Sequence, residues 1–125
     1  MLPFDVRDRE RAKVAIESLE GKWKSIDVLV NNAGLVIGFD KEFEGVLEEW
    51  DIVIDTNIKG LLNITRLVTP GMVQRGVGHI INIGSIAGDA AYPGGSVYCA
   101  TKAAVKTLSD GLRQDLVGTP LRVTN

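Results

Sequence analysis

Residues 79–102 read HIINIGSIAGDAAYPGGSVYCATK, and the order of elements in this stretch decides the fold. His79–Ile83 is a short apolar strand that ends abruptly in Gly84-Ser85. A helical pattern of apolar residues then runs from about Ser96 to Val117. The stretch therefore predicts a strand, a turn that carries a serine, and a long helix.

Tyr98 and Lys102 stand four residues apart on this predicted helix, which places phenol and ammonium on one face, about 5–6 Å apart at their β-carbons. A cation that close favours the phenolate form of a tyrosine. The pair is typical of a general acid and base, with the Ser85 hydroxyl available to hold a carbonyl or alcohol oxygen. A tyrosine and a lysine at this spacing are more often a surface pair, so the rest of the chain has to support catalysis.

Outward from this stretch, the same reading predicts three more strands and two more helices. The strands are Pro3–Val6, Ile26–Val30 and Leu121–Thr124, and the helices are Arg7–Trp23 and Leu47–Arg75. Pro70 lies inside the longer helical pattern and is expected to kink or divide it, because proline removes one bond of the helix ladder. Trp23 is expected to be a packing residue.

Strand and helix alternate along the whole chain, which predicts an α/β fold with a right-handed, doubly wound parallel sheet. Its short, mostly apolar strands are typical of a sheet covered on both faces. Ligands bind such sheets beyond the carboxyl ends of the strands. Because Asp5, Asn32-Ala33-Gly34 and Ser85 all lie at strand ends, we expect them to share one edge of the sheet.

Composition excludes several classes of function. The 125 residues carry a formal net charge of −2, which offers no basic stripe for nucleic acid or for a membrane surface. No apolar run approaches the roughly 20 residues of a membrane span. The only cysteine, Cys99, and the only histidine, His79, exclude disulfide frameworks and multi-histidine or cysteine-based metal sites. We expect Cys99 to be a small packing residue and the protein to work in a reducing cytoplasm.

Several separated motifs together resemble the short-chain dehydrogenase/reductase family over nearly the whole chain. They are Asp5-Val6, Asn31-Asn32-Ala33-Gly34, Asn57 within Thr56-Asn57-Ile58-Lys59-Gly60, Ser85, and Tyr98-x-x-x-Lys102, in the order and spacing of the family. Within the family, residues 26–34, 70–88 and 92–102 are most similar to NADP-dependent 3-hydroxy acid dehydrogenases that act on serine and allo-threonine.

The resemblance implies a catalytic set that passes a hydride between a nicotinamide cofactor and the substrate carbon that carries the oxygen. Tyr98 gives or takes the hydroxyl proton, and Ser85 hydrogen-bonds the same oxygen, so both contact the substrate. Lys102 favours the phenolate and binds the ribose hydroxyls next to the nicotinamide. Asn57 holds a water molecule next to the lysine.

The resemblance also implies further contacts to the cofactor. Asp5 accepts a hydrogen bond from the adenine amino group, Val6 offers its backbone beside the ring, and Asn32-Ala33-Gly34 lie along the ribose, where small side chains let the backbone approach closely. On local grounds alone, a strand-end or helix-capping acid is the favoured explanation of Asp5. Asn57 is then a solvent-facing or locally bonded asparagine at a helix irregularity.

The family begins with a strand and a Gly-rich turn whose backbone donors hold the pyrophosphate, and nothing before Asp5 supplies them. We therefore expect residues 1–125 to be the central part of one NAD(P)-binding domain, with strands 3 to 6 of the order 3-2-1-4-5-6. The strand that ends at Asp5 would then lack a neighbour. NADP is the expected cofactor, with NAD as the alternative, and the 125 residues alone are expected neither to bind it tightly nor to turn over.

The expected partner is a small-molecule substrate, a 3-hydroxy acid such as serine or allo-threonine. One alternative is a carbonyl or 3-ketoacyl reductase of the same family, which shares the catalytic residues. Another is a structural module that assembles through the helices at 47–75 and 96–117, which pair between subunits in many relatives and predict a homodimer or homotetramer. A structural module, however, has no use for Ser85, Tyr98 and Lys102 in this arrangement.

Overall fold

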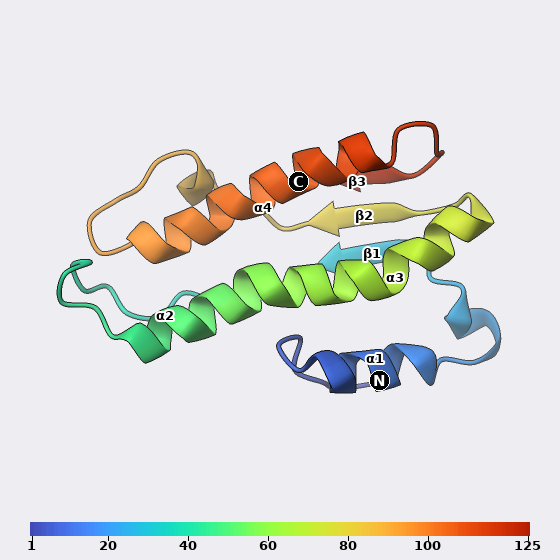
Figure 1. The fold of residues 1–125 in the computed structure, drawn as a ribbon, viewed down its shortest axis with the longest axis horizontal. Helices are drawn as coiled ribbons and strands as arrows, with labels where there is room; N and C mark the ends of the chain where they lie inside the picture. The colour runs from blue at the N-terminus through green and yellow to red at the C-terminus, as the bar shows by residue number, and fades with distance from the viewer.

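The computed structural model describes all of residues 1–125, and its centre is a parallel sheet of three strands (Figure 1). The strands β1 (Val28–Asn31), β2 (His79–Asn82) and β3 (Arg122–Thr124) lie side by side in chain order. Val28 pairs with His79, and His79 pairs with Arg122. The predicted α/β class and parallel sheet are confirmed, and the three neighbours match the last three strands of the predicted order.

Helices connect the strands. They are α1 (Arg9–Glu17), α2 (Leu47–Ile54), α3 (Leu61–Arg75) and α4 (Ser96–Asp115), with short 3₁₀ turns η1 (Gly21–Lys24) and η3 (Ile86–Gly88) and a π-helical segment η2 (Asp55–Gly60). α3 packs on β1, α4 packs on β3, and α1 packs on α3. In Figure 1, α3 and α4 lie in front of the sheet with nearly parallel axes.

The hydrophobic core lies between the sheet and these helices. Its buried members come from α1, β1, α3, β2 and the end of α4: Ala12, Leu29, Ile64, Val68, Met72, Ile80 and Leu116. Leu29 and Ile80 are register partners on neighbouring strands, so one layer of the core runs across the sheet. Met72 and Ile80 are fully buried. Burying one apolar side chain of this size stabilises the folded protein by about 1.5–3 kcal/mol.

The opposite face of the sheet is open within these 125 residues. Val28 is 55% exposed, Val30 is 51% exposed and Ile83 is 42% exposed, whereas their neighbours Leu29 and Ile80 are buried. Alternate residues of a strand point to opposite faces. The sequence predicted a sheet covered on both faces, but in these 125 residues helices cover only the face that carries Leu29 and Ile80.

The helical pattern at 47–75 is interrupted, but not where proline predicted. α3 continues through Pro70, and the irregular turn is η2, six residues with π-helical bonding between α2 and α3. Pro70 and Arg66 are both exposed, so water can satisfy the Arg66 carbonyl that proline leaves without a donor. Gly76, with a φ of 68°, ends α3 in the left-handed conformation that glycine adopts most readily.

The N-terminal expectations need correction. No strand forms over Pro3–Val6, because the ladder bonds of a strand need a neighbouring strand and this segment has none. The predicted helix at Arg7–Trp23 is shorter: Asp8 caps α1, which ends at Glu17. Trp23 therefore lies off the helix in η1, where it is 69% exposed with the Lys22 ammonium 5.3 Å from its ring centre. It is not the packing residue that the pattern indicated.

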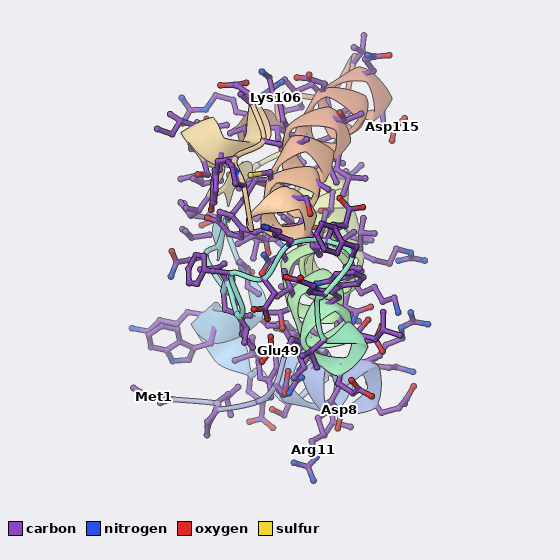
Figure 2. The ribbon with its side chains drawn as sticks, turned by 90° about the vertical axis from the view of Figure 1, so that its left-hand side faces the viewer. Met1, Asp8, Arg11, Glu49, Lys106 and Asp115 are labelled. Carbon is purple, nitrogen blue, oxygen red and sulfur yellow. The ribbon has the colours of Figure 1, made fainter.

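The carboxyl ends of the strands and the N-terminal ends of α2 and α4 meet at one edge of the molecule, where the long loops gather (Figure 1). Figure 2 looks onto this edge, with Glu49 near the start of α2 and Lys106 and Asp115 farther along α4. None of the helices combines the length and apolar character that crossing a bilayer requires.

Candidate active site

Six of the sequence-predicted site residues gather at this edge from three segments. Asn32, Ala33 and Gly34 follow directly after β1, and Ser85 follows β2 by three residues. Tyr98 and Lys102 lie in the first two turns of α4. The expectation that strand ends and the Tyr-Lys pair share one region is met for these residues.

Lys102 is held inside this region. Its side chain is 9% exposed, and its ammonium donates a 2.8 Å hydrogen bond to the backbone carbonyl of Ile83, one residue beyond β2. The same ammonium lies 5.9 Å from the centre of the Tyr98 ring. Burial lowers the pKa of Lys102, because desolvation disfavours the charged form. Tyr98 itself is half-buried, so this is not a surface pair.

Ser85 presents its hydroxyl at the surface of the same edge. The Ser85 Oγ accepts a 3.1 Å hydrogen bond from the backbone N–H of Ala87 and so caps η3. The hydroxyl hydrogen donates to no group of the protein, which leaves one donor for an oxygen outside it. η3 packs on α4, and a β-carbon at Gly88 would lie 2.8 Å from the backbone carbon of Lys102.

Asn57 lies in η2 and is 2% exposed. Its Oδ1 accepts from the Leu35 N–H at 2.9 Å, and its Nδ2 donates to the Leu35 carbonyl at 2.9 Å and to the Thr101 hydroxyl at 3.0 Å. A β-carbon at Gly34 would lie 3.5 Å from the Asn57 Oδ1 and 3.6 Å from the Lys102 ammonium. Asn57, Gly34 and Lys102 are therefore neighbours, and Asn57 sits at a helix irregularity, as the local interpretation allowed.

Asp5 and Val6 are placed by other contacts. The Asp5 carboxylate is held by Arg7, with Arg7 Nη2 2.7 Å from Asp5 Oδ2, and this hydrogen bonding lowers the pKa of Asp5. The Val6 carbonyl accepts from the Asn63 amide at 3.0 Å, and a β-carbon at Gly60 would lie 2.6 Å from Val6 Cγ2. Val6 thus packs on the π segment that carries Asn57.

Two polar residues near the site, Thr101 and Asn82, were not predicted from the sequence. The Thr101 hydroxyl donates to the Tyr98 carbonyl at 2.7 Å and accepts from Asn57, so it joins α4 to η2. Asn82 is 2% exposed and donates to the Ser109 hydroxyl at 2.9 Å. Asparagine is uncommon in strands, so its place in an apolar strand was a usable signal. Thr101 offered none, because a helix threonine commonly bonds within its own helix.

The other singled-out residues have structural roles. Cys99 is 4% exposed, as expected of a small packing residue. The His79 ring contacts the Thr124 hydroxyl at 2.8 Å and the Arg122 guanidinium at 3.2 Å, across two strands of the sheet. Chemically, the edge therefore offers a buried cation beside a phenol, one free serine hydroxyl, and a glycine that leaves space in front of the cation.

A family model described as short chain dehydrogenase matches residues 1–125. The chain is 54% identical over 122 residues to the NADP-dependent 3-hydroxy acid dehydrogenase YdfG of Salmonella typhi. The aligned region covers 98% of this chain and 49% of that protein. The chain thus spans about half the length of this curated relative.

Two solved structures are similar throughout the described fold. The crystal structure of serine dehydrogenase from Escherichia coli superposes with a TM-score of 0.94 at 52% identity, over 96% of this chain and 56% of that one. The closed form of serine dehydrogenase complexed with NADP⁺ gives a TM-score of 0.95 at 52% identity, over 96% of this chain and 48% of that one.

Proposed function

The chain belongs to the short-chain dehydrogenase family, and we propose that the protein containing it transfers a hydride between NADP(H) and a small 3-hydroxy acid such as serine or allo-threonine. The observation that carries this proposal is the buried Lys102 ammonium, 5.9 Å from the centre of the Tyr98 ring. Relatives named as NADP-dependent 3-hydroxy acid dehydrogenase and serine dehydrogenase support the choice of cofactor and substrate class.

Tyr98 is the proposed general base for oxidation and the general acid for reduction. In oxidation, the phenolate takes the proton of the substrate hydroxyl, and the nearby Lys102 cation stabilises the phenolate before the transfer. Lys102 holds its position because one of its three N–H donors is fixed by the Ile83 carbonyl. The lysine side chain is long and has many rotamers. The hydrogen bond to Ile83 fixes one of them before the cofactor binds, so binding need not bear that loss of conformational entropy.

Ser85 is the proposed second contact to the substrate oxygen. Its oxygen is already oriented by the Ala87 N–H, so the hydroxyl hydrogen can point outward to the substrate. A donor fixed before the substrate arrives costs little reorganisation when charge develops on that oxygen. Ser85 and Tyr98 would therefore hold one oxygen between them.

NADP fits the residues at this edge. Gly34 has no side chain where a β-carbon would lie 3.6 Å from the Lys102 ammonium, so there is space for a ligand in front of the two remaining Lys102 donors. Lys102 and Tyr98 would contact the nicotinamide ribose, and the exposed residues Asn32, Ala33 and Gly34 would line it. When bound, oxidised NADP supplies the hydride acceptor.

The remaining family residues complete the proposal. Asp5 would accept from the adenine amino group and Val6 would lie beside the ring, although Arg7 already holds the Asp5 carboxylate. Asn57 would act through a water molecule next to Lys102, from a position fixed by its bonds to Leu35 and Thr101. Residues 1–125 would be the central part of one NAD(P)-binding domain, as their coverage of about half of the relatives suggests.

Assembly into a homodimer or homotetramer belongs to the same proposal. A groove on the outer side of α3 and α4 is lined by Leu62, Thr65, Arg66, Thr69, Pro70, Val73, Gln74 and Leu112. Within it, the Thr69 hydroxyl is buried without a hydrogen-bond partner, and Leu62 and Val73 are each 43% exposed. Sedimentation of the intact protein, with Val73→Lys as the disrupting variant, tests this assembly. The cytoplasmic location stays a prediction.

The activity is tested with the intact protein and a panel of substrates. Serine, allo-threonine and 3-hydroxypropionate are each supplied with NADP⁺ or NAD⁺, and formation of the reduced cofactor is followed. We expect the fastest oxidation with NADP⁺ and one of these three acids. Activity confined to 3-ketoacyl or other carbonyl substrates would instead support the reductase alternative of the same family.

A further inference from the structure

The end of β2 holds α4 at two points. The Ile83 carbonyl accepts from the Lys102 ammonium at 2.8 Å, and the preceding residue, Asn82, donates from its side chain to the Ser109 hydroxyl at 2.9 Å. Lys102 and Ser109 are seven residues apart, which is about two helical turns or roughly 10.5 Å along the axis. Asn82 and Ile83, which are adjacent at the end of β2, therefore form hydrogen bonds with one face of α4.

The Asn82–Ser109 contact is built into the interior. Ser109 is 0% exposed and Asn82 is 2% exposed. The Ser109 hydroxyl donates to the Val105 carbonyl at 2.7 Å, so its oxygen has one fixed orientation in which to accept from Asn82. Water has no access to replace either partner, and loss of the hydroxyl would leave the Asn82 amide without an acceptor.

The contact continues across the sheet. The Asn31 amide donates to the Asn82 Oδ1 at 2.8 Å and to the Thr65 hydroxyl at 3.0 Å. Asn31 and Asn82 are register partners at the ends of β1 and β2. Thr65 lies on α3, directly after the π segment that carries Asn57. One polar chain, Thr65–Asn31–Asn82–Ser109, thus joins both helices of the site to the strand ends.

We propose that Asn82 and Ser109 are positioning residues, which set the axial position of α4 so that the Lys102 ammonium bonds to the Ile83 carbonyl and lies near the Tyr98 ring. This inference rests on the proposed function of Tyr98 and Lys102. A displaced helix would move the ammonium relative to the phenol. Gly34, Ile83 and Gly88, which lie against Lys102 from other elements, carry no titratable group, so Tyr98 is the titratable neighbour that would respond.

The test uses the intact protein with serine and NADP⁺ and records kcat as a function of pH. Ser109→Ala removes the acceptor, and we expect kcat to fall about tenfold, since small misplacements at a catalytic centre cost up to about 10²-fold. We also expect the midpoint of the pH–kcat profile to move by about half a unit. Ser109→Cys keeps a weak donor and acceptor of similar size. Its pH–kcat profile should therefore lie between those of the wild type and Ser109→Ala.

Thr107→Val is the matched control, because Thr107 is exposed on the same helix and its hydroxyl bonds to nothing in the protein; both readouts should equal those of the wild type. A Ser109→Ala protein that melts at a lower temperature but keeps the wild-type kcat and pH profile would overturn the inference, because the contact would then only stabilise the fold. Tyr98→Phe is measured in parallel. If that variant turns over normally, the proposed function fails, whatever Ser109→Ala does.

Discussion

The Lys102 ammonium lies 5.9 Å from the centre of the Tyr98 ring while its hydrogen bond to the Ile83 carbonyl fixes it in place. This relationship joins the beginning of α4 to the end of β2. Because the lysine is buried, its charge acts on the phenol through less water than a surface pair would have between its members.

Lys102→Met is expected to change how stability depends on pH. Burial lowers the pKa of Lys102 in the folded state, so below that pKa the folded protein bears the full cost of a desolvated charge. As pH rises toward 10.5, the usual lysine value, the folded state loses its proton first and the cost is relieved. The wild type should therefore gain stability relative to Lys102→Met between pH 7 and pH 10.5.

Urea unfolding of both proteins at several pH values in this range measures that difference. Titratable groups that do not interact with Lys102 contribute equally in the two proteins and cancel. Carrying Tyr98→Phe in both proteins removes the one titratable neighbour that Lys102 affects. A difference that stays constant, or that moves in favour of Lys102→Met as pH rises, would contradict the burial argument.

Asn57→Ala should destabilise the protein by about 2–4 kcal/mol, because it leaves buried partners without their hydrogen bonds. The partners are the Leu35 N–H, the Leu35 carbonyl and the Thr101 hydroxyl. Asn32→Ala is the stability control, since Asn32 is exposed and its side chain makes no hydrogen bond within the protein. It should change the free energy of unfolding by about 0.5 kcal/mol or less. Equal effects of the two variants would show that the hydrogen bonds from Asn57 to Leu35 and Thr101 do not stabilise the fold.

Gly88→Ala should lower the stability of the protein. Its β-carbon would lie 2.8 Å from the Lys102 backbone carbon and 2.9 Å from the Lys102 oxygen, and backbone atoms cannot move aside as a side-chain tip can. We expect a loss of about 1–3 kcal/mol, typical of overpacking. In Gly71→Ala the nearest atom is the end of the flexible Arg75 side chain at 3.2 Å, so this helix substitution should be neutral or stabilising by up to about 1 kcal/mol. Thermal unfolding of both variants decides the matter.

Gly34→Ala should separate cofactor binding from folding. The added β-carbon would make ordinary contacts, 3.5 Å from the Asn57 Oδ1 and 3.6 Å from the Lys102 ammonium, so stability should be unchanged. It would nevertheless occupy the space in front of the ammonium, and the Kd for NADP⁺ should rise about tenfold. Calorimetric titration of the intact protein measures that Kd. An unchanged Kd would remove Gly34 from the cofactor site.

The regular part of the fold could be predicted from the sequence. α4 was expected at Ser96–Val117 and is observed at Ser96–Asp115, because its apolar positions follow the helical period and glycines precede and follow it. The predicted strand at Ile26–Val30 is observed at Val28–Asn31, and the one at His79–Ile83 begins as predicted and ends one residue earlier, at Asn82. The spacing of Tyr98 and Lys102 then placed both side chains in one region.

The irregular part could not be predicted, for physical reasons that differ between residues. The π segment at Asp55–Gly60 keeps the apolar pattern of an α-helix, so periodicity does not reveal it, while Pro70 suggested a break that the exposed helix face does not require. A strand at Pro3–Val6 depends on a neighbour that local sequence cannot supply. The bonds among Asn31, Asn82 and Ser109 join residues far apart in the chain, and only the fold brings them together.

Our claim that Tyr98 moves the proton in hydride transfer to NADP⁺ is tested by the Tyr98→Phe variant of the intact protein. Its kcat for serine oxidation and its Kd for NADP⁺ are measured against the wild type. Removing a general acid or base typically costs about 10²- to 10⁴-fold, so we predict a loss of at least about 10²-fold in kcat while most of the affinity for NADP⁺ is retained. Near-normal turnover by Tyr98→Phe would contradict the claim.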